Sequence, residues 1–325
     1  MKVGLIDVDG YNYPNLPLMK LSAYHKSLGD TVEWYNHMFG GHYDIVYMSK
    51  VFSFTDDFKY KPHADRIIKG GTGYAISSCD NSELYDKNKD VNLPFDVEHI
   101  YPDYSLYPER TKDTAYGFLS RGCPRGCDFC IVGKKEGRCS IKVADLSEFW
   151  RGQKNIVLCD PNIIACKEWK DLLQQLIDSK AYIDINQGLD MRMMTEEKAE
   201  YLKQIKIKQI HFAWDRYEDK ELIVPKFKMF QQITGWTKSK MTVYVLTNFN
   251  TTLEQDLDRI YTLIDLNYFP YVMIYEKYKL PKGHVLRKLQ KWVNSKVGIT
   301  SCPKFEDFDY KNFIKNKEGR HKTLF

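Results

Sequence analysis

Residues 120–130 read SRGCPRGCDFC and place three cysteines within eight positions of one another. Cys123, Cys127 and Cys130 follow the spacing C-x3-C-x2-C, whereas the whole chain holds only eight cysteines. Gly and Pro residues between them favour tight turns, so the three thiols can wrap a single inorganic centre from one side. Three thiolates leave one metal position open, which is a feature of catalytic centres. The spacing therefore predicts a metal or iron–sulfur site in this loop.

The composition indicates a globular protein of a reducing compartment. The chain has 325 residues, of which 43% are hydrophobic and 14% aromatic, enough for one or two sizeable cores. No apolar run reaches the roughly 18 residues that a membrane-spanning helix requires, and the start, MKVGLIDVD, lacks the features of a signal peptide. We therefore expect a cytoplasmic protein without a membrane partner, whose cysteines are thiols or metal ligands rather than disulfides.

The positive charge is concentrated at the C-terminal end. Residues 271–325 hold 13 Lys or Arg against 5 Asp or Glu, a net charge of +8, whereas the whole chain carries +5. A basic end of this kind is either a nucleic-acid contact or a solvated surface, and the sequence leaves both open.

Short β-branched or aromatic runs alternate with helical patterns along the chain, which predicts an α/β fold. In the N-terminal part we expect strands at 3–8, 31–35, 44–48 and 66–68 and a helix at 17–28. This order suggests a small doubly wound, Rossmann-like sheet over residues 1–73. Residues 74–112 accumulate Asp, Asn, Lys, Pro and Tyr without a period, so we expect a connecting segment there.

A second series of strands begins near Thr114. The six expected strands are 115–119, 156–159, 183–186, 209–214, 242–247 and 270–275. Helical patterns lie between them at 145–152, 165–179, 195–204, 219–233 and 252–265, and a sixth follows His284. Six strand–helix units predict either a second doubly wound sheet or an incomplete barrel. The cysteine loop follows the first of these strands, where a parallel α/β domain places its ligand-binding groups.

These features together resemble the radical S-adenosylmethionine (radical SAM) enzymes. That family carries a C-x3-C-x-aromatic-C loop after the first strand of a partial (β/α)6, TIM-like barrel, and Phe129 stands at the aromatic position. LCDPN at 158–162 is similar to the family motif that meets the methionyl amino group, and NQGLDMR at 186–192 looks like a turn of one large branch. The resemblance implies a barrel domain over residues 113–300, followed by a basic tail over 301–325.

The resemblance also implies the chemistry. Cys123, Cys127 and Cys130 would hold a [4Fe–4S] cluster, and S-adenosylmethionine would chelate the fourth iron through its amino and carboxylate groups. An external one-electron donor of the flavodoxin or ferredoxin type would reduce the cluster, and cleavage of the sulfonium would give methionine and a 5′-deoxyadenosyl radical.

The resemblance assigns cofactor-binding roles to further residues. Phe129 would lie near the adenine, and Asp160 or Asn162 would accept a hydrogen bond from the methionyl ammonium. Arg192 would pair with a carboxylate. Gln187 and Asp190, on the same motif, complete the cofactor-binding set. From the residues alone, Phe129 is equally a core side chain, and Asp160 or Asp190 equally a helix cap.

The same branch often carries an N-terminal domain related to cobalamin-binding domains, and residues 1–73 fit that outline. Its Asp-x-His-x-x-Gly ligand loop is absent, because DVDGYN at 7–12 has no His at the required place. We therefore do not expect cobalamin. Methylthiotransferases of the superfamily hold a second cluster on three N-terminal cysteines, whereas this chain has only Cys79 there, so we do not expect that activity either.

Two questions stay open at this point. Cys139 could close a four-thiolate site with the trio, giving a structural zinc or iron–sulfur module of a nucleic-acid-binding protein without catalysis. The substrate is also not identified: the basic end favours a nucleic acid or nucleotide, and a peptide or small metabolite remains open.

Polar residues in or after the later strands are candidates to face the cavity: Asp184, His211, Asp215 and Asn248. We expect no auxiliary cluster on Cys159, Cys166 and Cys302, which are far apart in sequence.

Overall fold

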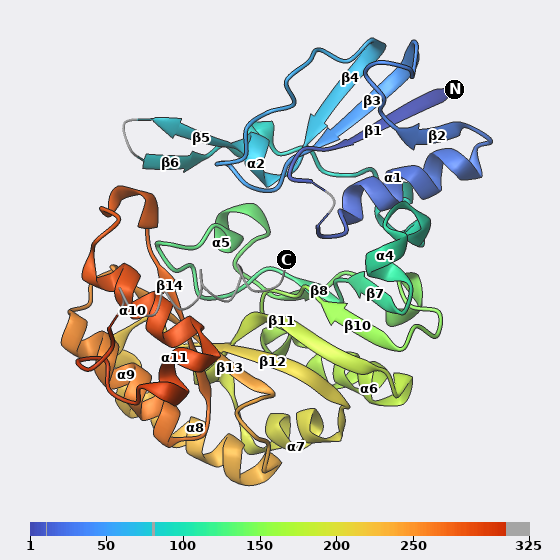
Figure 1. The fold of residues 1–325 in the computed structure, drawn as a ribbon. Coiled ribbons are helices and arrows are strands. Elements are labelled where there is room, and N and C mark those ends of the chain that lie inside the picture. The colour runs from blue at the N-terminus through green and yellow to red at the C-terminus, as the bar shows by residue number, and fades with distance from the viewer. Residues whose placement is uncertain (11, 80–81, 310–325) are drawn as a thin grey trace, which may run out of the picture. The chain divides into compact units, whose positions relative to one another are not determined.

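The computed structural model describes residues 1–10, 12–79 and 82–309. The chain is an α/β protein with parallel sheets, and it divides into two units after Asp184 (Figure 1). No helix in these ranges is long and apolar enough to cross a bilayer. The predicted fold class is therefore confirmed at the level of α/β architecture.

The N-terminal part of the first unit holds a four-stranded sheet in the order β2-β1-β3-β4, with all neighbours parallel. Its elements are β1 (Lys2–Asp7), α1 (Leu16–Ser27), β2 (Thr31–Trp34), β3 (Tyr43–Ser49) and β4 (Ala64–Gly70). Every strand and the helix expected in this part is present. The order reverses between β1 and β3, and the carboxyl ends of these two strands are where a doubly wound sheet forms its crevice.

Both faces of this sheet are packed. Val3 and Leu5 of β1 pack with Leu18 and Leu21 of α1 on one face, whereas Ile6 packs on the other face with β3 residues. The near-continuous apolar run of β1 is typical of a strand buried on both sides. Asn15 fixes the start of α1, because its Oδ1 accepts a hydrogen bond from the N–H of Leu18 at 3.3 Å.

Residues 74–112, expected as a connecting segment, contain short elements of secondary structure. They form α2 (Thr72–Ala75), the antiparallel pair β5 (Ile76–Cys79) and β6 (Ser82–Tyr85), α3 (Phe95–Glu98) and α4 (Pro108–Thr111), with 3₁₀ turns η1 (Lys87–Lys89) and η2 (Tyr104–Leu106). Asp86 and Asp103 cap the two 3₁₀ turns, so the residues that broke the period are used as local caps. Tyr107 ties the segment to the first sheet, because its hydroxyl donates to Asp7 Oδ2 at 2.7 Å.

A six-stranded sheet follows, and its strand order is that of the chain: β7-β10-β11-β12-β13-β14. Its strands are β7 (Thr114–Gly117), β10 (Asn155–Leu158), β11 (Tyr182–Asp190), β12 (Ile207–Ala213), β13 (Met241–Thr247) and β14 (Phe269–Ile274). All six expected strands are therefore confirmed. The pairs β7–β10, β12–β13 and β13–β14 are parallel. The division between the two units falls within β11.

Helices follow the later strands and cover one face of the sheet (Figure 1). They are α6 (Trp169–Ser179), α7 (Glu196–Gln204), α8 (Lys220–Thr234), α9 (Leu253–Asp265), α10 (Val285–Asn294) and α11 (Lys296–Ser301). Smaller 3₁₀ turns are η3 (Leu146–Glu148), η4 (Ile163–Ala165), η5 (Met191–Met193), η6 (Tyr217–Asp219) and η7 (Lys277–Lys279). The residues of β12 and β13 that alternate toward the helices are fully buried, as Phe212 and Val243 illustrate.

The expected helix at 145–152 is wrong, because only the single turn η3 forms there. Phe149 ends the turn and is 3% exposed. A Cβ at Gly117 would lie 2.4 Å from the Phe149 ring, so the ring occupies the space that this glycine leaves. Tertiary packing thus overrides the helical pattern.

The C-terminal part expected as a basic tail begins as packed structure. Phe305 and Phe308 are 6% and 4% exposed and belong to the core around Trp292 of α10. The N–H of Phe305 donates to Tyr261 Oη at 3.0 Å. Residues 310–325, which carry the most basic stretch, lie outside the described residues.

Candidate functional site

The three cysteines lie on a long loop between β7 and β10 whose base is closed by a short antiparallel pair. In this pair, β8 (Ser120–Arg121) lies beside β9 (Ile141–Lys142), with Arg121 opposite Ile141. Just inside it, the N–H of Gly122 donates to Glu136 Oε2 at 3.1 Å, and the N–H of Cys123 donates to the carbonyl of Gly137 at 3.2 Å. The loop carrying the cysteines is therefore anchored at both ends by its own backbone.

Glycine permits the sharp bends inside the loop. Gly122 has φ +86°, and a Cβ there would lie 2.1 Å from the carbonyl oxygen of Cys139, so no other residue fits this position. The N–H of Cys130 donates to the carbonyl of Cys127 at 3.0 Å, which closes a turn and keeps these two residues close. Cys123, Cys127 and Cys130 are all partly exposed. Phe129, between the last two, is half-buried.

Asp160 lies directly after β10 and holds the start of the loop. Its carboxylate accepts hydrogen bonds from the N–H of Leu119 at 2.9 Å and from the N–H and hydroxyl of Ser120 at 2.5 and 2.6 Å. The side chain is fully buried, and this burial raises its pKa to about 7 against the opposing effect of the three donors. The structure therefore gives Asp160 a positioning contact to the loop backbone.

Asn162 lies beside the first cysteine. Its Nδ2 is 3.9 Å from Cys123 Sγ, and its backbone carbonyl accepts a hydrogen bond from Ser140 Oγ at 3.1 Å. The stretch 160–162 thus contacts the loop at both ends and at its first cysteine. The structure thus brings two sequence-predicted residues, Asp160 and Asn162, to the cysteine loop about forty positions earlier, with Asn162 beside Cys123.

Within the described part of the chain, no three His, Cys, Asp or Glu side chains lie close enough to hold one metal ion together. A single ion needs all its ligands around one point, whereas in a four-iron cluster each cysteine binds a different iron. The loop supplies three partly exposed thiols on a backbone fixed at its base. Three thiols are the donor type that such a cluster takes.

The other predicted motif occupies the end of β11 and the turn η5. Gln187 is exposed, whereas Asp190 is 7% exposed. Arg192 Nε donates to Asp190 Oδ1 at 2.7 Å, and its Nη1 donates to Asp219 Oδ2 at 2.8 Å. Arg192 is therefore held by two carboxylates of its own chain. Asp219 was not predicted, since nothing in its sequence context distinguishes it.

The polar candidates of the later strands have local partners. His211 Nδ1 donates to the carbonyl of Ile185 at 2.8 Å, and its ring stacks on Tyr244 with centroids 5.1 Å apart. Asn248 Nδ2 donates to the carbonyl of Tyr275 at 2.8 Å. Burial raises the pKa of Asp215, which follows β12, to about 6. Asp184, on β11, is partly buried. Tyr244, which sequence reasoning missed, also donates its hydroxyl to the carbonyl of Asn186 at 3.1 Å.

Arg259 on α9 joins the carboxyl ends of two strands. Its Nη1 donates to the carbonyls of Trp214 and Asp215 after β12, at 2.7 and 3.1 Å, and its Nη2 donates to the carbonyl of Leu246 on β13 at 2.8 Å. Nη2 also contacts Asp256 Oδ1 at 2.5 Å, and both side chains are completely buried. A charged pair on the apolar side of the helical pattern is a sequence feature that could have revealed it.

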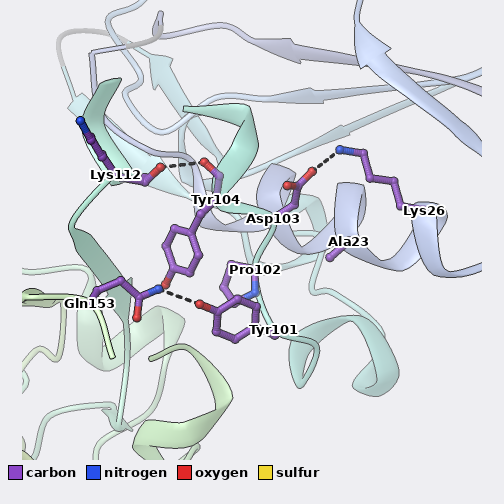
Figure 2. A pocket seen from close by; sticks show the side chains of 9 residues that line it. Ala23, Lys26, Tyr101, Pro102, Asp103, Tyr104, Lys112 and Gln153 are labelled. Atoms are coloured by element: carbon purple, nitrogen blue, oxygen red, sulfur yellow. Dashed lines mark hydrogen bonds and ion pairs between the residues drawn. The ribbon is translucent and has the colours of Figure 1, made fainter. Parts of the chain in front are cut away.

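A separate hollow of about 460 Å³ lies in the first unit near the amino ends of β7 and β10 (Figure 2). Its polar lining groups bind one another: Gln153 Nε2 donates to Tyr101 Oη at 2.6 Å, and Lys26 Nζ lies 2.6 Å from Asp103 Oδ2. None of the predicted site residues lines it. These four lining side chains are therefore already paired with one another.

No family model and no curated protein matches the sequence. Among solved structures, the crystal structure of Streptococcus suis SuiB bound to S-adenosylmethionine is similar at a TM-score of 0.43 and 13% identity. The match covers 59% of this chain and 50% of that chain, so this chain spans half the length of its neighbour. A second SuiB structure gives a TM-score of 0.40 and 12% identity over 57% of this chain and 46% of that one. Likeness of this degree carries no argument about what this chain does.

Replacing Asp160 with Ala is expected to loosen the cysteine loop. Because two backbone N–H groups and one hydroxyl would lose a buried acceptor, the free energy of unfolding should fall by about 2–4 kcal/mol. Asp160→Asn keeps one acceptor oxygen, so its free energy of unfolding should fall less than that of Asp160→Ala. Urea unfolding of both variants measures this, with Asp178→Ala on the exposed side of α6 as the control. An Asp160→Ala protein as stable as the control would show that the carboxylate does not hold the loop.

Proposed function

We propose that the chain is a radical SAM enzyme that holds a [4Fe–4S] cluster on Cys123, Cys127 and Cys130 and binds S-adenosylmethionine. The observation that carries this proposal is the placement of the cysteine loop. It follows β7, the first strand of a sheet whose order is that of the chain, and it is anchored at its base and by Asp160. Such loops at the carboxyl ends of parallel strands are where α/β enzymes build their active sites.

The proposed architecture follows from the same sheet. We propose that β7 to β14 form a partial (β/α)6 barrel, because each strand lies next to its predecessor and a helix follows most of them. The sheet β2-β1-β3-β4 would be a separate doubly wound domain related to cobalamin-binding domains. No cobalamin is proposed, since the required His is absent from residues 7–12.

When bound and reduced, the cluster supplies the electron that cleaves S-adenosylmethionine to methionine and a 5′-deoxyadenosyl radical. The residues of this chain would hold the cluster and orient S-adenosylmethionine. The three thiolates would hold the cluster and leave one of its irons without a protein ligand, and Asp160 fixes the backbone from which the loop starts. Asn162, beside Cys123, is the better placed of the two residues proposed to meet the methionyl ammonium, because the carboxylate of Asp160 already accepts three hydrogen bonds. Electrons would come from a flavodoxin- or ferredoxin-type donor of the cytoplasm.

The test is turnover without a known substrate. Protein purified without oxygen should be brown and hold about four irons and four sulfides per chain. Reduced with dithionite and given S-adenosylmethionine alone, it should slowly release 5′-deoxyadenosine, with no added corrinoid.

Colourless protein with one tightly bound zinc would overturn the proposal in favour of a structural module. A complete, reducible cluster that yields neither 5′-deoxyadenosine nor S-adenosylhomocysteine, even with cell extract added as a substrate source, would make the loop a binding or electron-transfer site.

A further inference from the structure

The connection between β14 and α10, residues 275–284, is an exposed segment of the second unit with a net positive charge. We call it the basic turn. Lys277, Lys279 and Lys282 are exposed within it, and Glu276 is its one acidic residue. Glu276 pairs with Lys279 at 2.7 Å. Among the described residues, nothing of opposite charge pairs with Lys282 or Lys277. The turn therefore presents a surplus of positive charge to solvent.

The backbone of the basic turn is held in shape. Arg287 of α10 reaches back, and its Nη2 donates to the carbonyls of Lys277 and Leu280 at 2.7 and 2.8 Å. Glu276 adopts φ +46°, a left-handed conformation that is costly for a residue other than glycine. His284 Nδ1 accepts from the N–H of Leu286 and so caps α10. Lys277 Nζ donates to Gln290 Oε1 of α10 at 2.5 Å. A fixed backbone that carries exposed lysines loses little entropy when it binds a polyanion.

Aromatic rings accompany these charges. Tyr278, at the tip of the turn, is 61% exposed. Tyr271 and Met273, on the face of β14 away from the helices, are 40% and 46% exposed, and Tyr271 meets the Tyr244 ring edge to face at 5.8 Å. Exposed rings beside lysines are the combination that binds single-stranded nucleic acid, because bases stack on the rings while the lysines neutralise phosphates.

The position of the basic turn favours a substrate contact. It leaves the carboxyl end of β14, the edge at which parallel α/β sheets gather their ligand sites. We infer that the basic turn and Tyr278 bind a single-stranded nucleic acid, which would be the substrate of the enzyme proposed above. An anionic membrane would suit the lysines, but the described turn lacks the amphipathic helix that such binding uses.

Fluorescence anisotropy with labelled RNA and DNA strands of about 20 nucleotides tests the inference. The probe is titrated with the full-length, cluster-loaded protein over salt from about 50 to 300 mM. Compared with the wild type, Lys277→Gln/Lys279→Gln/Lys282→Gln should weaken binding at least about tenfold at low salt and reduce the slope of log K against log salt by about 2. Tyr278→Ala should weaken binding roughly 5- to 100-fold through lost stacking.

The matched control is Lys203→Gln/Lys206→Gln/Lys208→Gln, which removes the same charge from exposed positions at the amino end of β12. It should bind like the wild type. The inference is overturned if the wild type does not bind at low salt, if both triple variants weaken binding equally, or if phosphatidylserine vesicles are bound and the oligonucleotides are not. Binding needs no S-adenosylmethionine, so the two proposals can fail separately. If the protein releases 5′-deoxyadenosine but does not bind the oligonucleotides, the nucleic-acid substrate is ruled out and the proposed function stands.

Discussion

Replacing Cys123, Cys127 and Cys130 together with Ala is expected to remove all cluster iron and to abolish 5′-deoxyadenosine release. Iron should fall from about four atoms per chain to none, because no other three cysteines of the chain are so closely spaced in sequence. Iron and sulfide analysis, the visible absorption shoulder and the cleavage assay measure the loss. The melting temperature should change little, since the loop is anchored by β8, β9 and Asp160 rather than by its thiols.

Two cysteines of the same chain provide the controls. Cys139 is exposed, and Cys302 Sγ donates to the carbonyl of Lys304 at 3.1 Å. Cys139→Ala and Cys302→Ala should each keep the full iron content and the full cleavage rate. A triple variant that retains its cluster would contradict the assignment. If Cys139→Ala loses its metal as completely as the triple variant does, a four-thiolate site that includes Cys139 takes its place.

A second large effect, on the free energy of unfolding, is expected when Arg259 is replaced. Arg259→Ala should lower the free energy of unfolding by about 3–5 kcal/mol, because it leaves Asp256 as a buried charge without its partner. The carbonyls of Trp214 and Leu246 would also lose their donor. Arg259→Lys keeps the charge but not the planar fork that reaches several carbonyls, so it should recover only part of the loss. Urea unfolding followed by circular dichroism measures these differences.

The matched control is a more exposed ion pair between Asp258 of the same helix, α9, and Lys220 at the start of α8. Lys220 Nζ lies 2.6 Å from Asp258 Oδ2, and both side chains are about a third exposed. Asp258→Ala should cost no more than about 1 kcal/mol. Equal losses for Arg259→Ala and Asp258→Ala would mean that the buried pair does not hold β12 and β13 together. The double change Asp256→Asn/Arg259→Met should be less damaging than Arg259→Ala alone, because it removes both charges.

The strands were predictable because their runs of buried apolar residues are long and are punctuated by turns. All ten expected strands are present. An apolar run such as that of β13 is too short for a helix, so a buried strand is the remaining interpretation. The failures are local. The helix expected at 145–152 gives way to one turn, because Phe149 packs against Gly117, a contact between positions far apart in sequence. In residues 74–112, caps and short turns have no period to detect.

The site was predictable only in part, because some of its contacts also join positions far apart in sequence. The spacing of Cys123, Cys127 and Cys130 is local, so the sequence carries it completely. The contact of Asp160 with the backbone of Ser120 joins positions forty residues apart, so the sequence alone did not reveal that this carboxylate holds the loop. Arg259 was missed because a charged residue in a helical pattern is normally solvent-exposed, although its place near Asp256 on the apolar side of that pattern was a signal. The carbonyls that it binds are seen only in the structure.

The closed base of the cysteine loop bears on the order in which the mature protein is assembled. Zinc fingers and many small metal-binding modules stay unfolded until the ion arrives, so their metal is a folding partner. Here the loop is tied down by backbone hydrogen bonds and by Asp160, none of which involves a thiol. The iron-free chain should therefore leave synthesis already folded, with delivery of iron and sulfide as a separate, later step. Cells starved of iron would accumulate a stable, inactive reserve that becomes active without new protein synthesis.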